Sequence, residues 1–293
     1  MMITIELSAE RYQLDITKPL SLAIPVEFIL QKNITSDKTE IQPNHFSANL
    51  ASSKPMQAGP FIGDTEQGGS CNVNELTINP HCNGTHTETI AHICDLNHPY
   101  SKNIAEISHS PLMPCVLISI EPKPIKNTNE SYTPALQKED LLITRSALES
   151  LLANYSDIQL QCLVVRTLPN ENNKCCQVYS QSNQPPFFSR EAVNYLNTRG
   201  VEHLVLDIPS LDRLHDDGLL TCHHLFWQVE EGSHQANGKS LVNKTITEMA
   251  YINNQLSDGF YFINIKVPLF ITDAAPSNPV LYSCKIIASH NNN

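Results

Sequence analysis

Residues 189–208 read SREAVNYLNTRGVEHLVLDI, and this stretch decides the fold class of the chain. Ser189 is a residue type that caps helix N-termini, and Gly200 is a type that ends helices. An apolar stripe at helical spacing lies between them, formed by Ala192, Val193 and Leu196. The apolar run that follows, His203–Ile208, predicts a buried strand. The stretch therefore predicts a helix that leads directly into a strand.

The same alternation extends toward the N-terminus. Two apolar, β-branched runs, Cys115–Ile120 and Cys162–Val165, predict further buried strands. A helix is expected over Thr144–Tyr155, where Ser146 and Glu149 have the spacing of a capping box. The apolar face of this helix is formed by Leu148, Leu151 and Leu152. Strands and helices joined by short connections are typical of a βαβ core.

Further strands are expected at both ends of the chain. Apolar or alternating patterns predict five of them: Ile3–Leu7, Tyr12–Ile16, Asn72–Asn79, Tyr261–Val267 and Val280–Ile287. The last two are expected as antiparallel additions to the sheet, whereas residues 33–65 are polar and carry no clear element. We therefore expect one α/β domain over residues 1–293, with a mixed sheet and a β-rich N-terminal part.

Composition limits the classes of function. The chain has 293 residues, of which 41% are hydrophobic and 17% are charged, and this composition is typical of a globular protein. Its net charge of -11 disfavours binding to nucleic acid or to anionic membranes. The sequence shows neither a secretory signal nor an apolar run long enough to span a bilayer, so a cytoplasmic protein is expected.

The densest group of ligand-type side chains lies in residues 79–92, which read NPHCNGTHTETIAH. If this segment is extended, His86 and Glu88 point to the same side, and an imidazole beside a carboxylate is half of a divalent-metal site. Gly84 permits a tight bend just before them. A polar loop without metal is the alternative that the residue types alone leave open.

This segment resembles a family signature. The pattern Gly84-Thr85-His86-x-Glu88-x-x-x-His92 is similar to that of the cyclase family of metal-dependent hydrolases, which includes bacterial kynurenine formamidases and isatin hydrolases. Other segments match the family in the same order: Val165–Thr167, Phe188–Ala192, Leu206–Asp212 and Thr245–Glu248. The resemblance implies a swivelling β/β/α-type fold.

The resemblance also implies roles for individual residues. His86 stands at the second metal-ligand position of the signature, and Glu88 stands where the family has a bridging Asp. His92 stands at the position of the catalytic acid/base. Glu248 matches a later metal-binding carboxylate. A later histidine ligand is expected at His223 or His224, and the apolar residues that follow favour His223.

The first ligand position departs from the family pattern. By count it falls on Cys82, whereas a histidine, His81, comes one residue earlier. We favour His81, brought into reach by a one-residue bulge before Gly84, with Cys82 in the core. Three further departures from the family pattern indicate a divergent subgroup. They are Glu88 in place of Asp, Ile90 in place of a proline, and an insertion over about 230–244.

The function expected from this resemblance is hydrolysis of a carbon–nitrogen amide bond in a small N-formyl-arylamine or lactam. One or two divalent ions, Zn²⁺ or Mn²⁺, would be the cofactor, and a homo-oligomer is implied. The alternatives are a non-catalytic metal- or ligand-binding relative, and a cyclase or dehydratase acting on a small carbonyl compound. Asp207 and Asp212 either orient a ligand histidine or cap strand ends. The remaining histidines are expected to be structural or superficial: His45, His98, His109, His203, His215, His234 and His290.

Overall fold

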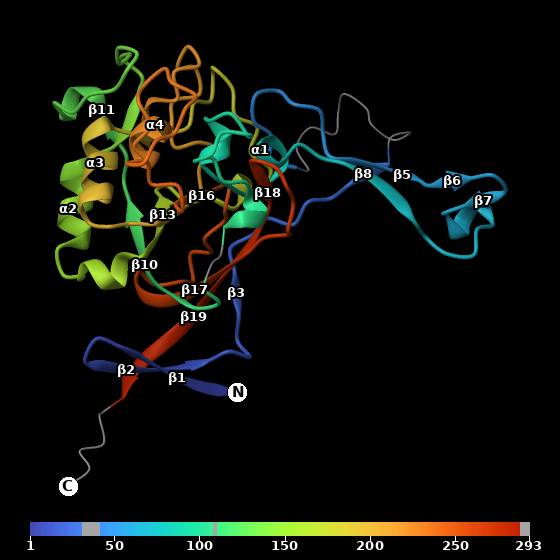
Figure 1. Cartoon of the computed structure of the whole chain (residues 1–293), viewed down its shortest axis with the longest axis horizontal. Helices are drawn as coiled ribbons and strands as arrows, with labels where there is room; N and C mark the ends of the chain where they lie inside the picture. The colour runs from blue at the N-terminus through green and yellow to red at the C-terminus, as the bar shows by residue number, and fades with distance from the viewer. Residues whose placement is uncertain (31–41, 108–109, 288–293) are drawn as a thin grey trace, which may run out of the picture.

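The computed structural model describes residues 1–30, 42–107 and 110–287, and a mixed sheet runs through the body of the protein (Figure 1). Its strands are β1 (Met2–Leu7), β2 (Glu10–Asp15), β3 (Leu20–Ser21), β9 (His86–Glu88), β10 (Met113–Ile120), β13 (Cys162–Thr167), β15 (His203–Leu206), β16 (Thr245–Glu248), β17 (Gly259–Lys266), β18 (Ala274–Pro276) and β19 (Asn278–Ile287). They follow the order β1-β2-β19-β17-β10-β13-β15-β16-β9-β18, and β3 pairs with β19.

The centre of this sheet is parallel. Strands β10, β13, β15 and β16 run in one direction. Antiparallel strands flank them, with β17 beside β10 and β9 beside β16. The carboxyl ends of the parallel strands therefore share one edge of the sheet, where α/β proteins commonly place their ligands.

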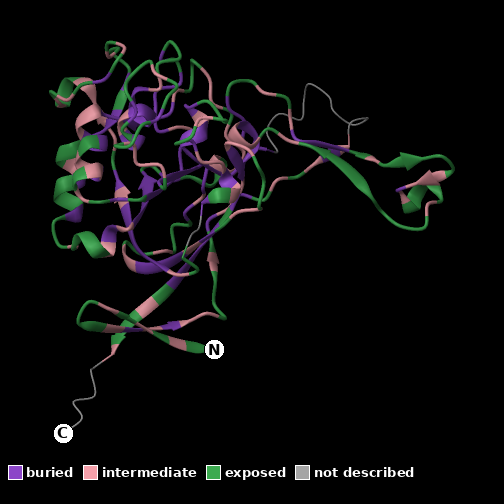
Figure 2. Ribbon diagram, viewed as in Figure 1, coloured by how far each residue is buried: buried purple, intermediate pink, exposed green. Residues whose placement is uncertain are grey.

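Helices cover one face of the sheet (Figure 1). They are α2 (Arg145–Leu152), α3 (Arg190–Thr198) and α4 (Thr221–Trp227), and a one-turn helix, α1 (Pro80–Asn83), lies beside β18. The inward side chains of the helices pack with Val116, Leu163, Leu204 and Ile246 of the sheet. Alternate strand residues point to the opposite face and form a second apolar cluster. Figure 2 shows the buried residues concentrated in this layered body.

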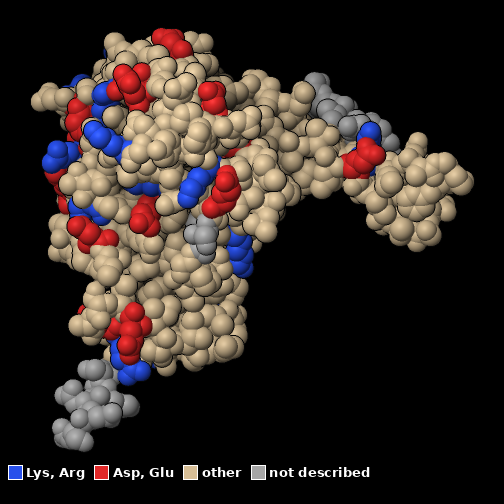
Figure 3. All heavy atoms as spheres, in the orientation of Figure 1, with Lys and Arg blue, Asp and Glu red and all other residues tan. Residues whose placement is uncertain are grey.

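An arm projects from the body on the side away from α2 and α3 (Figure 1). Strands β5 (Ser52–Pro55) and β8 (Asn74–Thr77) pair along it, β4 (Ile29–Leu30) joins β5, and β6 (Gln57–Ala58) pairs with β7 (Phe61–Ile62). Figure 3 shows charges of both signs over the body and few on the arm. Strand β8 leads back into α1, so the arm is directly connected to the histidine-rich segment. A last small sheet contains β11 (Lys123–Pro124), β12 (Leu141–Ile143) and β14 (Phe187–Phe188).

The expected α/β fold class is confirmed, and so are the helices and strands predicted in the core. The strand predicted over Asn72–Asn79 is present as the shorter β8, whose residues are exposed because it lies on the arm. The apolar face predicted for α2 is partly wrong, because Leu151 is exposed, whereas Leu148 and Leu152 are buried. In the described residues no helix is long and apolar enough to cross a membrane.

The cap of α2 also differs from the expected one. The hydroxyl of Thr144, not that of Ser146, accepts the hydrogen bond from the backbone N–H of Ala147, at 3.3 Å. Thr144 is buried and Ser146 is exposed.

We expect Thr144→Ala to lower the free energy of unfolding by about 1 kcal/mol, the usual cost of losing a helix cap. Ser146→Ala is the matched control and should change the free energy of unfolding by less than about 0.5 kcal/mol. Urea denaturation of both variants measures the difference. A larger loss of unfolding free energy in Ser146→Ala than in Thr144→Ala would instead support the capping box predicted from the sequence.

Candidate metal centre

The centre is built on the pairing of β9 with β16. Their antiparallel register places His86 opposite Glu248 and Glu88 opposite Ile246. Because alternate strand residues share a face, His86, Glu88 and Glu248 all point to the helix-covered side. On the other side, Thr87 and Thr247 join their hydroxyls in a hydrogen bond of 2.7 Å. The extended conformation expected for His86 and Glu88 is thus present, and it brings Glu248 to them.

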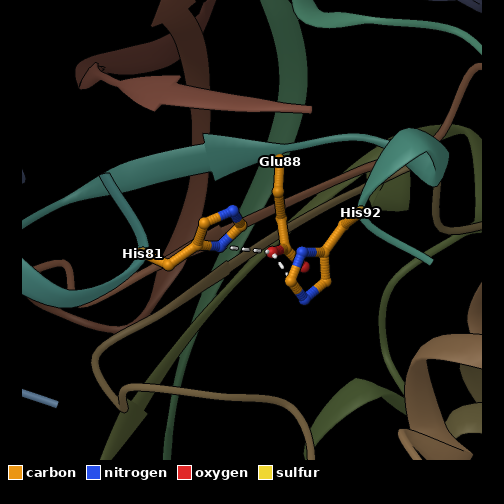
Figure 4. A group of neighbouring side chains, drawn as sticks. All are labelled: His81, Glu88 and His92. Carbon is orange, nitrogen blue, oxygen red and sulfur yellow. Dashed lines mark ion pairs between the residues drawn. The ribbon is translucent and has the colours of Figure 1, made fainter. Parts of the chain in front are cut away.

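Helix α1 brings His81 to the same carboxylate. The side chain of Asn79 caps this turn, and His81 Nδ1 lies 3.2 Å from Glu88 Oε2 (Figure 4). The expected bulge is wrong, because a helical turn rather than a bulged strand sets the direction of His81. Cys82 is buried, and its thiol belongs to neither group of potential metal ligands that the described residues form.

Helix α4 contributes His223. Its Nε2 lies 2.8 Å from Glu88 Oε1, and its Nδ1 lies 2.6 Å from Asp212 Oδ2. Neither His223 nor His224, the alternative that the sequence left open, belongs to the two groups of potential ligands in the described residues, but only His223 contacts Glu88. His224 is buried elsewhere in the helix. Of the two roles expected for Asp212, orienting a histidine or capping a strand end, the structure shows the first. Asp207 instead accepts hydrogen bonds from Thr167 and pairs with Lys174 at 2.7 Å.

His92 lies on the solvent side of the centre. It ends a short 3₁₀ turn over Ile90–His92, and its Nε2 lies 3.8 Å from Glu88 Oε2. Figure 4 shows the Glu88 carboxylate between the rings of His81 and His92. The side chains of His81 and His92 are each 25% exposed, whereas His86 and His223 are almost fully buried. His81 and His92 therefore form the solvent-facing side of the centre.

In each of the three histidines proposed as ligands, a group outside the centre contacts one ring nitrogen. His81 Nε2 contacts Asp273 Oδ2 at 2.8 Å, and His86 Nδ1 contacts the carbonyl of Gly84 at 3.0 Å. His223 Nδ1 contacts Asp212 in the same way. The second nitrogen of each ring faces Glu88 or Glu248. A carboxylate or carbonyl that fixes one nitrogen and leaves the other free is the usual support of a metal-binding histidine.

The electrostatics of the centre favour a cation inside it. Burial opposes charge on His81, but its contacts with Asp273 and Glu88 outweigh burial and raise its pKa to about 10. Burial likewise opposes charge on His223, yet Glu88 and Asp212 raise its pKa well above the usual range. The pKa of Glu88 is lowered despite its burial, because His92 and His223 stabilise its charge. The imidazoles and carboxylates of the centre thus favour each other's charged forms.

The donors fit a divalent metal ion. Among the described residues, the buried atoms His86 Nε2 and Glu88 Oε2 make no well-formed hydrogen bond, which is unusual for such atoms. Their nearest ionic partners are Glu248 Oε2 at 3.5 Å and His81 Nδ1 at 3.2 Å. The described residues form two sets of potential ligands, and within each set the ligand atoms lie within 4.8 Å of one another. One set is His81, Glu88 and His92, and the other is His86, Glu88 and Glu248. Imidazole and carboxylate donors suit Zn²⁺ or Mn²⁺, and Glu88 belongs to both sets.

The sequence analysis missed Asp273, which lies just before β18. Its Oδ2 contacts His81 and also lies 3.4 Å from His92 Nδ1. No neighbouring residue in the sequence carries a ligand-type side chain, so spacing gave no signal. His109 and His290 lie outside the described residues.

Comparison with known proteins places this geometry in a family. The model of a family described as putative cyclase matches residues 14–213. Among solved structures, a predicted metal-dependent hydrolase from Bacillus stearothermophilus is 14% identical, with a TM-score of 0.52 and coverage of 90% of this chain and 98% of that one. Isatin hydrolase A from Labrenzia aggregata is 13% identical, with a TM-score of 0.57 and coverage of 90% and 93%. The corresponding enzyme from Ralstonia solanacearum is 16% identical, with a TM-score of 0.55 and coverage of 90% and 91%.

A search of curated protein sequences finds no match. At these identities the solved structures establish the fold alone, and the family model carries the assignment. Because that model spans more than half of the sequence and includes the segment from His81 to His92, the chain belongs to the cyclase family.

Proposed function

We propose that the protein is a metal-dependent hydrolase that cleaves the carbon–nitrogen amide bond of a small N-formyl-arylamine or lactam. The observation that carries the proposal is the convergence of four imidazoles on the buried carboxylates Glu88 and Glu248. Solved structures of the same fold also support the proposal, because they include a predicted metal-dependent hydrolase and an isatin hydrolase.

The residues proposed to hold one or two ions are His81, His86, Glu88, His223 and Glu248. When bound, a divalent cation polarises a carbonyl group and lowers the pKa of water to about 7. Glu248 is held in place by the backbone N–H of Leu211, which donates to its Oε1 at 2.7 Å. Glu88 has one oxygen toward His223 and the other toward His81, so its carboxylate would be placed to hold one ion or two.

His92 is proposed as the acid/base. A ring nitrogen of an imidazole can accept a proton from water and deliver one to the leaving nitrogen of the amide. Its ring lies at the accessible side of the centre, where the substrate enters. Asp273 contacts Nδ1, which directs Nε2 toward the interior and keeps the ring in a fixed orientation.

The direct test is a substrate screen of the purified protein with Zn²⁺ or Mn²⁺. Formanilide represents N-formyl-arylamines and isatin represents lactams. We expect turnover of at least one of them, loss of turnover with a chelator, and recovery when the ion is restored. Tight metal binding without turnover of either amide would instead support the non-catalytic alternative, or an enzyme acting on another carbonyl compound.

We expect His81→Ala to lose metal and Cys82→Ala to keep it, because only the imidazole faces Glu88. Substituting a residue that only holds a metal ligand in place typically lowers metal affinity by about 10- to 100-fold. Because His81 is proposed as a ligand itself, His81→Ala should lower the affinity by more. Metal content after dialysis against a weak chelator measures this. Loss of metal from the Cys82 variant alone would show that the thiolate is the ligand.

We expect His92→Ala to retain metal while its kcat falls by about 10²- to 10⁴-fold, the usual contribution of a general acid–base group. Metal analysis and steady-state kinetics on the same preparation separate the two effects. Turnover close to that of the unsubstituted protein would rule out the acid/base role, and loss of the metal would make His92 a ligand.

We expect metal binding at pH 7 to release about two protons, one each from His81 and His223, because a ligand imidazole must be neutral. Their pKa values are raised, so the competing protonated form is favoured at low pH and the metal affinity rises with pH up to about 10. Calorimetry in buffers of different ionisation enthalpy counts the protons. His81→Ala should release about one fewer, and binding without proton release would contradict the arrangement.

A further inference from the structure

A lysine outside the metal centre is buried against helices α3 and α4. Lys244 is only 6% exposed and directly precedes β16, whereas Glu248 ends that strand. At about 3.3 Å per residue, the backbones of these two residues are about 13 Å apart along the strand. Lys244 also closes the insertion over about 230–244 that departs from the family pattern. It therefore lies outside the family signature and apart from the proposed metal ligands.

A cavity lies beside this lysine. Its volume is about 340 Å³, which is within the range of small-molecule sites. One wall is formed by Asn197 near the end of α3 and by Gly200 and Glu202, which follow that helix. The other wall is formed by residues 240–244. Two segments that are distant in the sequence thus enclose a space large enough for a small organic molecule.

The side chain of Lys244 crosses from one wall of the cavity to the other. Its Nζ donates a hydrogen bond to Oδ1 of Asn197 at 2.7 Å, and both residues line the cavity. The fully buried ring of Phe226 in α4 lies behind the amine, with 4.4 Å between Nζ and the ring centroid. The amine therefore forms part of the cavity floor, with the apolar core beneath it.

This amine lacks the partners that a buried ammonium group needs. An ammonium group has three donors, and Asn197 is the one acceptor that the described residues give to Nζ. The lysines that form ion pairs in the described part of the chain are Lys18, Lys54 and Lys174, and Lys244 is not among them. Burial without a counter-charge lowers the pKa of Lys244 to about 7, although Glu202 favours the charged form.

The groups around the amine do little to restore its charge. Glu202 is exposed, and its carboxylate accepts a hydrogen bond from Gln161 at 2.9 Å. The ammonium group of Lys102 contacts Asn243 of the cavity wall and so adds positive charge nearby. Helices α3 and α4 present only an amide and an aromatic ring to Nζ. A large share of the amine is therefore neutral near pH 7.

A neutral amine inside a cavity has a distinct chemistry. Its lone pair is a nucleophile, and desolvated lysines of this kind form Schiff bases with carbonyl compounds. The remaining wall suits an uncharged ligand, because Leu241 and Val242 are apolar and Ser240 and Asn243 are polar but neutral. A small carbonyl compound fits both the volume of the cavity and the reactivity of the amine.

We propose that Lys244 forms a reversible Schiff base with a small aldehyde or ketone held in this cavity. The Nζ lone pair attacks the carbonyl carbon, and a carbon–nitrogen bond forms while the carbonyl π pair moves to oxygen. Both protons of the neutral amine pass to that oxygen, which leaves as water when the C=N bond forms. Water reverses the step, so neither an oxidant nor a reductant is required. The site goes beyond the proposed hydrolase activity and does not depend on it.

The test traps the Schiff base on the metal-loaded protein. Salicylaldehyde is the carbonyl probe, borohydride reduces the C=N bond to a stable secondary amine, and mass spectrometry of peptides locates the adduct. Lys18, whose side chain is 81% exposed, is the internal reference. Lys244→Met removes the amine at similar length, whereas Val242→Phe keeps the amine and fills part of the cavity.

We expect at least about 10-fold more adduct at Lys244 than at Lys18 near pH 7.5. An amine with a pKa of about 7 is neutral several hundred-fold more often at this pH than an ordinary lysine, whose pKa is about 10.4. The adduct at Lys244 should rise through pH 7 and level off above about pH 8, whereas labelling of ordinary exposed lysines rises up to about pH 10. Val242→Phe should lower the adduct at Lys244 by about 10-fold or more and leave that at Lys18 unchanged.

Three results would overturn the inference. They are absence of an adduct at Lys244, equal adducts at Lys244 and Lys18, and an adduct at Lys244 that Val242→Phe does not reduce. If Val242→Phe does not fold, Ser240→Phe on the same wall replaces it. An adduct at Lys244 without turnover of any amide would uphold the inference and count against the hydrolase alone.

Discussion

The structure depends on the placement of one buried carboxylate, Glu88. A carboxylate taken out of water must be compensated by opposite charge and hydrogen bonds, or folding is strongly opposed. Here His81 and His223 carry that compensation, and Asp273 and Asp212 in turn hold them. An anion this enclosed, whose Oε2 has ionic contacts but no well-formed hydrogen bond among the described residues, is poorly explained as a packing device. It is well explained as the ligand of a cation.

The fold supplies the precision that such a centre needs. The register of β9 on β16 fixes His86 against Glu248, and the parallel strand ends bring the loop after β15 to the same edge. Helix α4 packs its apolar side into the core and turns His223 toward Glu88. Rigid elements thus carry the inner ligands, whereas His81 and His92 lie on short turns at the entrance.

Sequence reasoning was strongest where chemistry and local structure coincide. The residues from His81 to His92 lie in one short segment, and the order of family segments pointed to Glu248 and His223. Asp273 escaped notice because it is 181 positions from His92, and only the antiparallel pairing of β18 with β9 brings it near. The capping box predicted at Ser146 is wrong for another reason, since Thr144 is also a capping type and tertiary packing decides which of the two is buried. β8 has apolar residues but lies on an arm, which periodicity does not reveal.

The most direct test of the central claim is anomalous diffraction from crystals grown with Zn²⁺. The account predicts an anomalous peak about 2.0–2.2 Å from His86 Nε2 and from carboxylate oxygens of Glu88 and Glu248, with His223 turned onto the ion rather than onto Glu88. A second peak beside His81 would make Glu88 a bridge. Peaks confined to Cys82 or to the surface, with Glu88 still paired to His223, would contradict the account.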